Sequence, residues 1–275
     1  MTEMITDLDL VEWQLRIAAG EPLPMEQDEI VRRSEGCFAL EARICAEQVD
    51  RAGFSPSAGT LNSLVTLPEN VFIRVDTGFR EKHAILPYYD SMITKIIVRS
   101  FESRADALSQ LDYVLRNTAI SGVATNVTYL RAILNDPVYQ AGEMTTDYIE
   151  GRQDELMSWC ENQRDLALIV AAACVSKRMQ MPFGARNVWG MIPKQRKIKV
   201  GGEVTEVLHH DGEFEVKTSK GPGLLQGFDF ESEDEQWVRV NRKSLGATVR
   251  WDFSKQDINV WIDGRHFQFP FEVVA

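Results

Sequence analysis

A chain of 275 residues has room for one large domain or two modest ones, and its 44 % apolar and 26 % charged residues are an ordinary globular mixture. The net charge of −11 argues against a nucleic-acid partner and against an anionic membrane surface, because either would require a basic patch. The four cysteines have neither CxxC spacing nor a nearby set of histidines, so the sequence predicts no metal site and a reducing compartment.

The N-terminal segment, MTEMITDLDLVEW, contains acidic residues and no arginine, so it has the character of neither a signal peptide nor a transit peptide. Residues 7–19 are predicted to form the first helix, with Asp7 as its cap and Gly20 and Pro22 as its end. A polar link follows at residues 21–29. No apolar run approaches the roughly 20 residues that a membrane span needs.

Strands are predicted next, and their ranges are residues 37–47, 59–67, 71–77 and 92–98. The last of them is apolar almost throughout, which favours cover on both faces. Helical spacing follows at residues 104–117 and 125–134, with Gly122 as a turn and Thr125-Asn126 as a cap between the two helices.

Arg43 is the candidate anion-binding residue of the first strand. Alternation places the charged side chains of this strand on one face and its apolar side chains on the other, so Arg43 projects from a stiff, half-buried strand. Such a strand can hold a guanidinium in the fixed geometry that anion binding requires. The alternative is a surface ion pair of Arg43 with Glu41 or Glu47.

The composition changes over residues 144–162, where we place a domain boundary. Residues 164–177 are predicted to form a helix that is apolar nearly all round and therefore enclosed. Short alternating runs then predict antiparallel strands at residues 197–200, 203–209, 213–218, 237–240, 247–252, 258–262 and 266–271, separated by turn signals such as Gly221-Pro222-Gly223. The fold class is α+β, with an antiparallel sheet and packed helices followed by a curled β-barrel around one helix.

Several motifs in register resemble the C-terminal subdomain of biotin carboxylase, which is part of an ATP-grasp enzyme. They are EARICAE at residues 41–47, FSPSAGT at 54–60, IRVDT at 73–77 and PYYDSMITKIIV at 87–98. The later runs HDGEFEV, WVRVN and INVWIDGRHFQF resemble the BT linker domain of acyl-CoA carboxylase α subunits, most of all that of methylcrotonyl-CoA carboxylase. The resemblance implies a carboxylase subdomain at residues 1–150 and a BT-like barrel at 160–275.

In that family, ATP and bicarbonate give carboxyphosphate, magnesium offsets the phosphate charge, and the carbon passes to N1 of biotin. The resemblance implies that Arg43 is catalytic: it contacts biotin and stabilises its enolate. It implies substrate-binding roles for Tyr89 and Asp90 and an interface role for Arg74. The alternatives are a strand-end carboxylate that accepts backbone hydrogen bonds for Asp90 and a solvated face for Arg74.

The family's metal-binding carboxylates, base glutamate, glycine-rich lid and nucleotide lysines have no counterpart in this sequence. The biotin-carrying Met-Lys-Met signature has none either, since Met179-Gln180-Met181 has glutamine in place of lysine. We therefore expect a fragment that is inactive alone and that binds none of biotin, ATP and Mg²⁺ by itself. Its expected partners are the remainder of the biotin carboxylase, a separate biotin carrier domain and a carboxyltransferase β subunit.

Other hypotheses stay open at this point. The chain is alternatively a non-catalytic docking module for carboxylase or carboxyltransferase subunits, or an unrelated binding protein that has kept only the scaffold. The resemblance implies the mitochondrial matrix, but the sequence shows no transit peptide, and the cytoplasm is the other expectation. His209-His210 is a weak metal candidate, Ser91 lacks a histidine at a nucleophile's spacing, and the acidic run from Glu231 to Glu235 fits a solvated loop.

Overall fold

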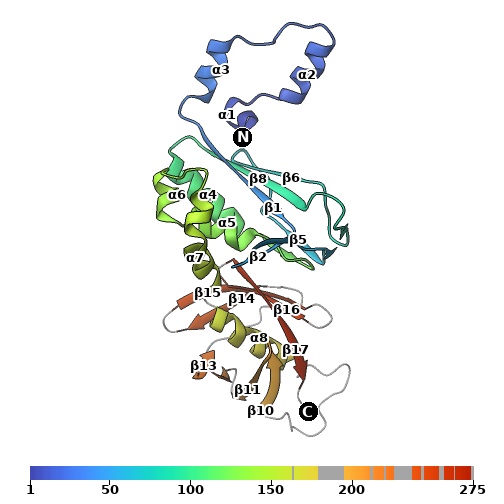
Figure 1. Cartoon of the computed structure of the whole chain (residues 1–275), viewed down its shortest axis with the longest axis vertical. Coiled ribbons are helices and arrows are strands. Elements are labelled where there is room, and N and C mark those ends of the chain that lie inside the picture. The colour runs from blue at the N-terminus through green and yellow to red at the C-terminus, as the bar shows by residue number, and fades with distance from the viewer. Residues whose placement is uncertain are drawn as a thin grey trace. The chain divides into compact units, whose positions relative to one another are not determined.

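The structure is a computed structural model that describes residues 1–162, 164–178, 195–210, 213–219, 221–225, 237–242, 245–253, 257–262 and 264–273. The chain divides into two compact units, Met1–Met157 and Ser158–Ala275. The division lies inside the stretch where the composition changes. Figure 1 labels the helices and strands of both units.

A three-stranded antiparallel sheet forms the centre of the first unit. Its strands are β1 (Phe38–Cys45), β8 (Met92–Ser100) and β6 (Ile73–Thr77), in the order β1-β8-β6. One face of this sheet is apolar and packs against α4 (Arg104–Arg116) and α5 (Val127–Leu134) (Figure 1). The buried core residues include Ile44 and Ile96, both fully buried. Period-2 alternation has thus sent the apolar side chains of β1 and β8 to the helical side.

The opposite, polar face of the sheet is covered at one end by the N-terminal helix α1 (Thr2–Thr6), which contacts β1 and β8. The predicted helix over residues 7–19 is wrong in its start. Asp7 adopts a left-handed conformation (φ 53°) and ends α1, and Asp9 accepts the hydrogen bond that caps α2 (Leu10–Ala18). Asp7 instead pairs with Arg99 of β8.

Short strand pairs complete the first unit. They are β2 (Glu47–Asp50) with β3 (Gly53–Pro56), β4 (Gly59–Thr60) with β7 (Ala84–Ile85), and β5 (Ser63–Val65) with β9 (Ala119–Ser121). The single strand expected over residues 59–67 is therefore two strands, because its halves pair with different partners. The further helices are α3 (Gln27–Ser34), α6 (Pro137–Ala141) and α7 (Tyr148–Glu161), of which α7 extends into the second unit.

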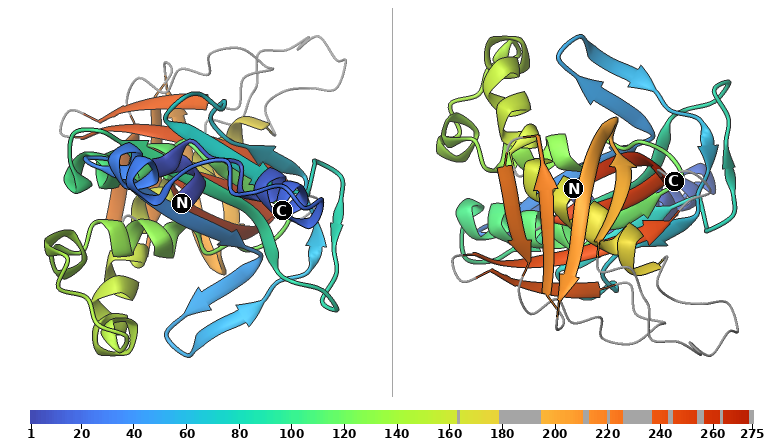
Figure 2. Two further views of the ribbon diagram at one scale, coloured as in Figure 1. Left: turned by 90° about the horizontal axis from the view of Figure 1, so that it is seen from above. Right: turned by 90° about the horizontal axis from the view of Figure 1, so that it is seen from below.

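The second unit is a curled antiparallel sheet around the helix α8 (Arg164–Arg178). Its strands run in the order β13-β12-β11-β10-β17-β16-β15-β14. Their bounds are β10 Gln195–Val200, β11 Glu203–His210, β12 Glu213–Thr218, β13 Gly221–Leu225, β14 Trp237–Arg242, β15 Leu245–Phe253, β16 Asp257–Ile262 and β17 Arg265–Val273. Figure 2, right, shows these orange and red strands around the yellow helix.

The helix α8 is apolar on nearly all sides, and the strands enclose it. Its buried residues from Ala167 to Val175 share one core with Phe214, Ile258 and Phe269 of the sheet. The α+β class and the curled sheet around one helix are thereby confirmed. The Gly221-Pro222-Gly223 segment, expected to be a turn, instead lies within strand β13, where it pairs with β12.

Two segments singled out in the sequence lie outside the described residues: Met179-Gln180-Met181 and the acidic run from Glu231 to Glu235. Within the described part of the chain, no helix has the length and apolarity needed to cross a membrane.

Candidate functional site at the end of strand β1

Arg43 stands on the polar face of the central sheet. The strand register places Arg43 of β1 opposite Lys95 of β8, and Lys95 opposite Asp76 of β6. Residues that are directly opposite in an antiparallel ladder share a face, so these charged side chains form one row across the sheet. The side chain of Arg43 is 70 % exposed, whereas its neighbour Ile44 is fully buried on the other face.

The partner of Arg43 is Glu41. The Nε–H of Arg43 donates to Glu41 Oε1 over 2.9 Å, and this hydrogen bond lowers the pKa of the Glu41 carboxyl and raises that of the guanidinium. The surface ion pair offered as the alternative for Arg43 is therefore present. Among the described residues, however, nothing hydrogen-bonds its two Nη nitrogens. One edge of the guanidinium is held and the other remains available to an anion.

Glu47, the other partner considered for Arg43, is engaged elsewhere. Its carboxylate accepts a hydrogen bond of 2.9 Å from the hydroxyl of Ser91. The carbonyl of Ser91 in turn accepts the backbone N–H of Ala46 over 2.7 Å. These two contacts hold the segment before β8 against the end of β1.

This docking brings Asp90 towards Arg43. One oxygen of Asp90 accepts the backbone N–H of Met92 over 3.0 Å, as the alternative for this residue supposed. Its charge also contributes to the raised pKa of Arg43, after the larger effects of Glu41. Tyr88 and Tyr89 directly precede Asp90 in the chain and are 86 % and 78 % exposed, so both aromatic side chains are accessible to solvent.

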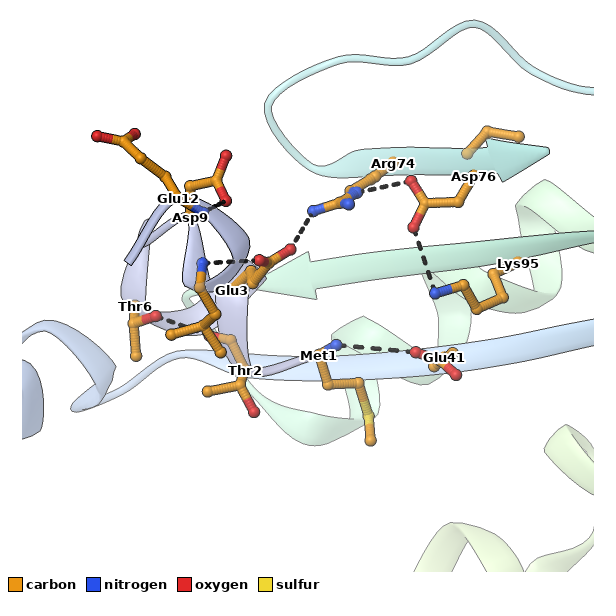
Figure 3. Close-up of polar contacts among 12 residues, drawn as sticks. Met1, Thr2, Glu3, Thr6, Asp9, Glu12, Glu41, Arg74, Asp76 and Lys95 are labelled. Atoms are coloured by element: carbon orange, nitrogen blue, oxygen red, sulfur yellow. Dashed lines mark hydrogen bonds and ion pairs between the residues drawn. The ribbon is translucent and has the colours of Figure 1, made fainter. Parts of the chain in front are cut away.

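Arg74 lies on β6, on the far side of β8 from Arg43. Figure 3 shows its guanidinium between two carboxylates, with bonds of 2.7 Å to Glu3 and 2.8 Å to Asp76. Burial acts to raise the pKa of Asp76, but Arg74 and Lys95 outweigh it and lower that pKa overall. The side chain of Arg74 is 40 % exposed and is tied within its own chain.

Sequence reasoning missed two residues of this site. Lys95 is the one charged residue in the apolar run MITKIIV, and that interruption was the available signal. Asn126 was expected to cap α5, yet its side chain makes no cap bond. It bonds instead to the backbone of Arg43 and Cys45, residues more than 80 positions away. No local pattern encodes such a contact.

A separate cavity of about 290 Å³ lies in the first unit, lined among others by Val75, Phe79 and Thr94. Neither Arg43, Tyr89 nor Asp90 lines it. Across the described residues, no group of three His, Cys, Asp or Glu side chains is placed to hold a metal ion.

Comparison with known proteins identifies the class. Residues 41–151 match the biotin carboxylase C-terminal domain family. The biotin carboxylase domain of 2-oxoglutarate carboxylase from Hydrogenobacter thermophilus superposes with a TM-score of 0.52 at 37 % identity, over 56 % of this chain and 33 % of that chain. The biotin carboxylase subunit of a pyruvate carboxylase gives the same TM-score at 33 % identity, with the same coverage of both chains. The first unit thus contains a biotin carboxylase C-terminal domain.

The curated relatives are more specific. The mitochondrial methylcrotonoyl-CoA carboxylase subunit alpha of Oryza sativa is 32 % identical over 98 % of this chain and 41 % of its own length. The corresponding subunit of Rattus norvegicus is 43 % identical over 57 % of this chain and 21 % of its own length. The chain is therefore a homologue of the α subunits of biotin-dependent carboxylases, most of all methylcrotonoyl-CoA carboxylase, as the motifs indicated. It spans less than half the length of these relatives.

Proposed function

We propose that these residues supply one part of the biotin carboxylation centre of a biotin-dependent acyl-CoA carboxylase α subunit, with methylcrotonoyl-CoA as the acyl substrate of the whole enzyme. The observation that carries the proposal is the exposed guanidinium of Arg43, mounted on β1 within the matched carboxylase domain. The rice relative aligns over both units, which supports a carboxylase α subunit rather than a lone carboxylase domain.

The proposed role of Arg43 is to bind biotin and stabilise its enolate. When N1 of biotin loses its proton, negative charge develops on the ureido oxygen, and a fixed cation beside that oxygen lowers the barrier. Glu41 holds Nε of Arg43, which fixes the plane of the guanidinium and leaves both Nη groups to donate. The raised pKa of Arg43 keeps it charged throughout.

The proposed substrate-binding residues are Tyr89 and Asp90. Tyr89 precedes Asp90 in the chain and offers an exposed ring suited to contact with the apolar faces of biotin, and Asp90 adds a negative charge that orients the guanidinium. Arg74 is proposed to lie at an interface with another carboxylase subunit, through the exposed part of its side chain.

The described residues of this chain suit biotin but not ATP or Mg²⁺. An exposed guanidinium suits the anionic form of biotin, which a separate carrier domain would present. The groups that hold ATP and Mg²⁺ in the complete enzyme are proposed to come from the remainder of the biotin carboxylase. There, magnesium supplies charge neutralisation at the phosphates. The isolated polypeptide is proposed to bind none of the three, which calorimetric titration with MgATP and with biotin would test.

A chimera provides the test for Arg43. This chain would replace the aligned part of the rice α subunit, and ATP- and bicarbonate-dependent carboxylation of free biotin would be measured. Arg43→Ala should lower kcat/KM by about a hundredfold or more, as expected for loss of a charge aimed at the transition state. Arg33→Ala is the matched control, because Arg33 is also exposed and paired with a glutamate, but on helix α3. Unchanged activity of Arg43→Ala would contradict the proposal.

The 275-residue polypeptide by itself is expected to show no such carboxylation, and measurable turnover would overturn that expectation. The proposed partners in the complete enzyme are the rest of the carboxylase, the biotin carrier domain and a carboxyltransferase β subunit. The mitochondrial names of the relatives support a matrix location, which imaging of the complete subunit would check.

A second function, as a non-catalytic docking module, is supported by one observation. Helix α2 buries none of its residues, and Val11, Leu15 and Ile17 on it are 62 %, 69 % and 46 % exposed. Such an apolar surface suits contact with another subunit. Capture of a carboxyltransferase β subunit by the isolated chain, together with an inactive chimera, would favour this alternative.

A further inference from the structure

The outer edge of strand β1 carries the contact from which we draw a further inference. Within the central sheet, β1 pairs with β8 on one side only, so the backbone groups on its other side need different partners. At the position of the functional arginine, a single residue provides them. Asn126 Nδ2 donates to the carbonyl of Arg43 over 3.1 Å, and Asn126 Oδ1 accepts the N–H of Cys45 over 3.0 Å.

The backbone of Asn126 adds a third bond, from its N–H to the carbonyl of Cys45 over 3.3 Å. One residue therefore satisfies three backbone groups of β1, as a neighbouring strand would. Asn126 is 8 % exposed, so these bonds are shielded from water. A buried side-chain amide with both its donor and its acceptor used is a specific restraint on position.

The inner edge of β1 cannot hold this segment equally well. The pairing of β1 with β8 shifts register between Ile44 and Cys45, where one extra residue of β8 is accommodated. Such an irregularity breaks the regular ladder and bends the strand. It falls one residue beyond Arg43, so the strand loses regular support on one side close to the point where the direction of that side chain must be fixed.

Asn126 is itself held firmly. The turn before it is anchored by a hydrogen bond of 3.0 Å from the N–H of Ala124 to the hydroxyl of Ser57, and by a backbone bond from Asn62 to Ser121. On its other side, the carbonyl of Asn126 accepts the N–H of Leu130 and so begins helix α5. The amide is thus carried by a rigid junction between a turn and a core helix.

We propose that Asn126 is the positioning residue for Arg43: its side-chain amide fixes the backbone of β1 at the register shift and thereby sets the direction of the guanidinium. The consequence for biotin chemistry rests on the proposed function. The positioning itself does not, because it concerns only contacts within this chain. Sequence position alone would have assigned Asn126 to helix capping.

The test uses the full 275-residue chain labelled with 15N and two signals in NMR spectra. The first is the hydrogen-exchange rate of the Cys45 amide, which reports the bond to Asn126. The second is the Nε–H resonance of Arg43, which reports the bond to Glu41 and hence the guanidinium's direction. The variant is Asn126→Ala. The control is Asn135→Ala, which removes an amide bonded to Asp112 and to the carbonyl of Arg131 at the other end of α5.

In Asn126→Ala, exchange of the Cys45 amide should accelerate by about tenfold to a hundredfold relative to the other amides of the sheet, as expected for loss of a buried hydrogen bond. The Arg43 Nε–H resonance should shift towards that of an unbonded arginine. Asn135→Ala should change neither signal. An unmoved Arg43 resonance in Asn126→Ala would overturn the proposal, and so would an equal change in the control.

Should Asn126→Ala unfold the first unit, Asn126→Asp carries the test. The carboxylate keeps the acceptor for Cys45 and loses the donor to Arg43, so the Arg43 signal should move while the Cys45 amide stays protected. The opposite pattern would overturn the proposal. Because neither signal needs biotin or ATP, failure here leaves the proposed function standing. Failure of the proposed function would appear only in the chimera assay.

Discussion

Replacing Gly122 with alanine would test the packing that delivers Asn126 to strand β1. Gly122 has a φ of +97°, and a Cβ built on it would lie 1.9 Å from the carbonyl oxygen of Thr60 and 2.9 Å from the nitrogen of Asn62. Both are backbone atoms, so no side chain can rotate away. The turn or strand β4 must move, or the contact between them must open.

The expected cost has two parts. A side chain at positive φ costs about 1–2 kcal/mol, and forcing an atom into a close-packed contact costs about 1–3 kcal/mol more. The sum, about 2–5 kcal/mol, is a large share of the roughly 5–15 kcal/mol that stabilises a typical domain. Gly142→Ala should carry only the first part of the cost, because Gly142 also has a positive φ, +80°, with nothing within 4 Å of its Cβ position. The difference in unfolding free energy between the two variants therefore isolates the second part.

The assay is urea unfolding, monitored by hydrogen exchange in peptides from the first unit. A single global signal would mix the unfolding of the two units. Gly122→Ala should lower the free energy of unfolding of the first unit by about 1–3 kcal/mol more than Gly142→Ala does. It should also raise exchange at the Cys45 amide, because Asn126 follows the same turn. Equal destabilisation by the two variants would refute the steric argument.

Three further outcomes follow from the structure. Arg43→Ala should leave the urea midpoint of the first unit unchanged, since its side chain is 70 % exposed, and a marked loss of stability would show an unrecognised structural role. Asp112→Ala should destabilise the unit by about 3 kcal/mol, because Arg131, with a side chain only 6 % exposed, loses its carboxylate; calorimetry would check this, and a neutral effect would contradict it. Burial acts to raise the pKa of Asp136, but bonds from Arg152 and from backbone N–H groups lower it overall. Its stabilising contribution should be complete above the unfolded-state pKa of about 3.9 and be lost as pH falls through the lower folded-state pKa. Asp136→Asn should flatten that loss in a pH series of unfolding midpoints, and an unaltered acid limb would exclude Asp136 as its source.

Several parts of the fold could be read from residues a few positions apart. The alternation in residues 37–47 predicted which side chains of β1 face the core, and Ile44 is indeed fully buried while Arg43 is exposed. The apolar run in α8 predicted an enclosed helix, and the curled sheet surrounds it. These succeed because the periods of 2 and 3.6 residues are properties of the local backbone.

Two wrong predictions of secondary structure share one cause. Residues 59–67 read as one strand, but Gly59–Thr60 pairs with β7 and Ser63–Val65 pairs with β9, so distant partners divide the segment. Asp7 read as a helix cap, yet Arg99 of β8 draws it to the end of α1. In each case a contact with a remote part of the chain overrides a local preference.

At the candidate site, too, local features could be predicted from the sequence and remote contacts could not. The sequence by itself determined that Arg43 would project from a rigid strand, since that follows from alternation, and its motifs indicated the carboxylase family. Only the tertiary structure decided that Glu41 rather than Glu47 is its partner, because Ser91 engages Glu47 from a segment 44 residues away. It also decided that Asn126 fastens the strand from 83 residues away. The physical reason is that a face of a strand is set by neighbours in sequence, whereas a hydrogen-bond partner is set by whatever the folded chain brings within about 3 Å.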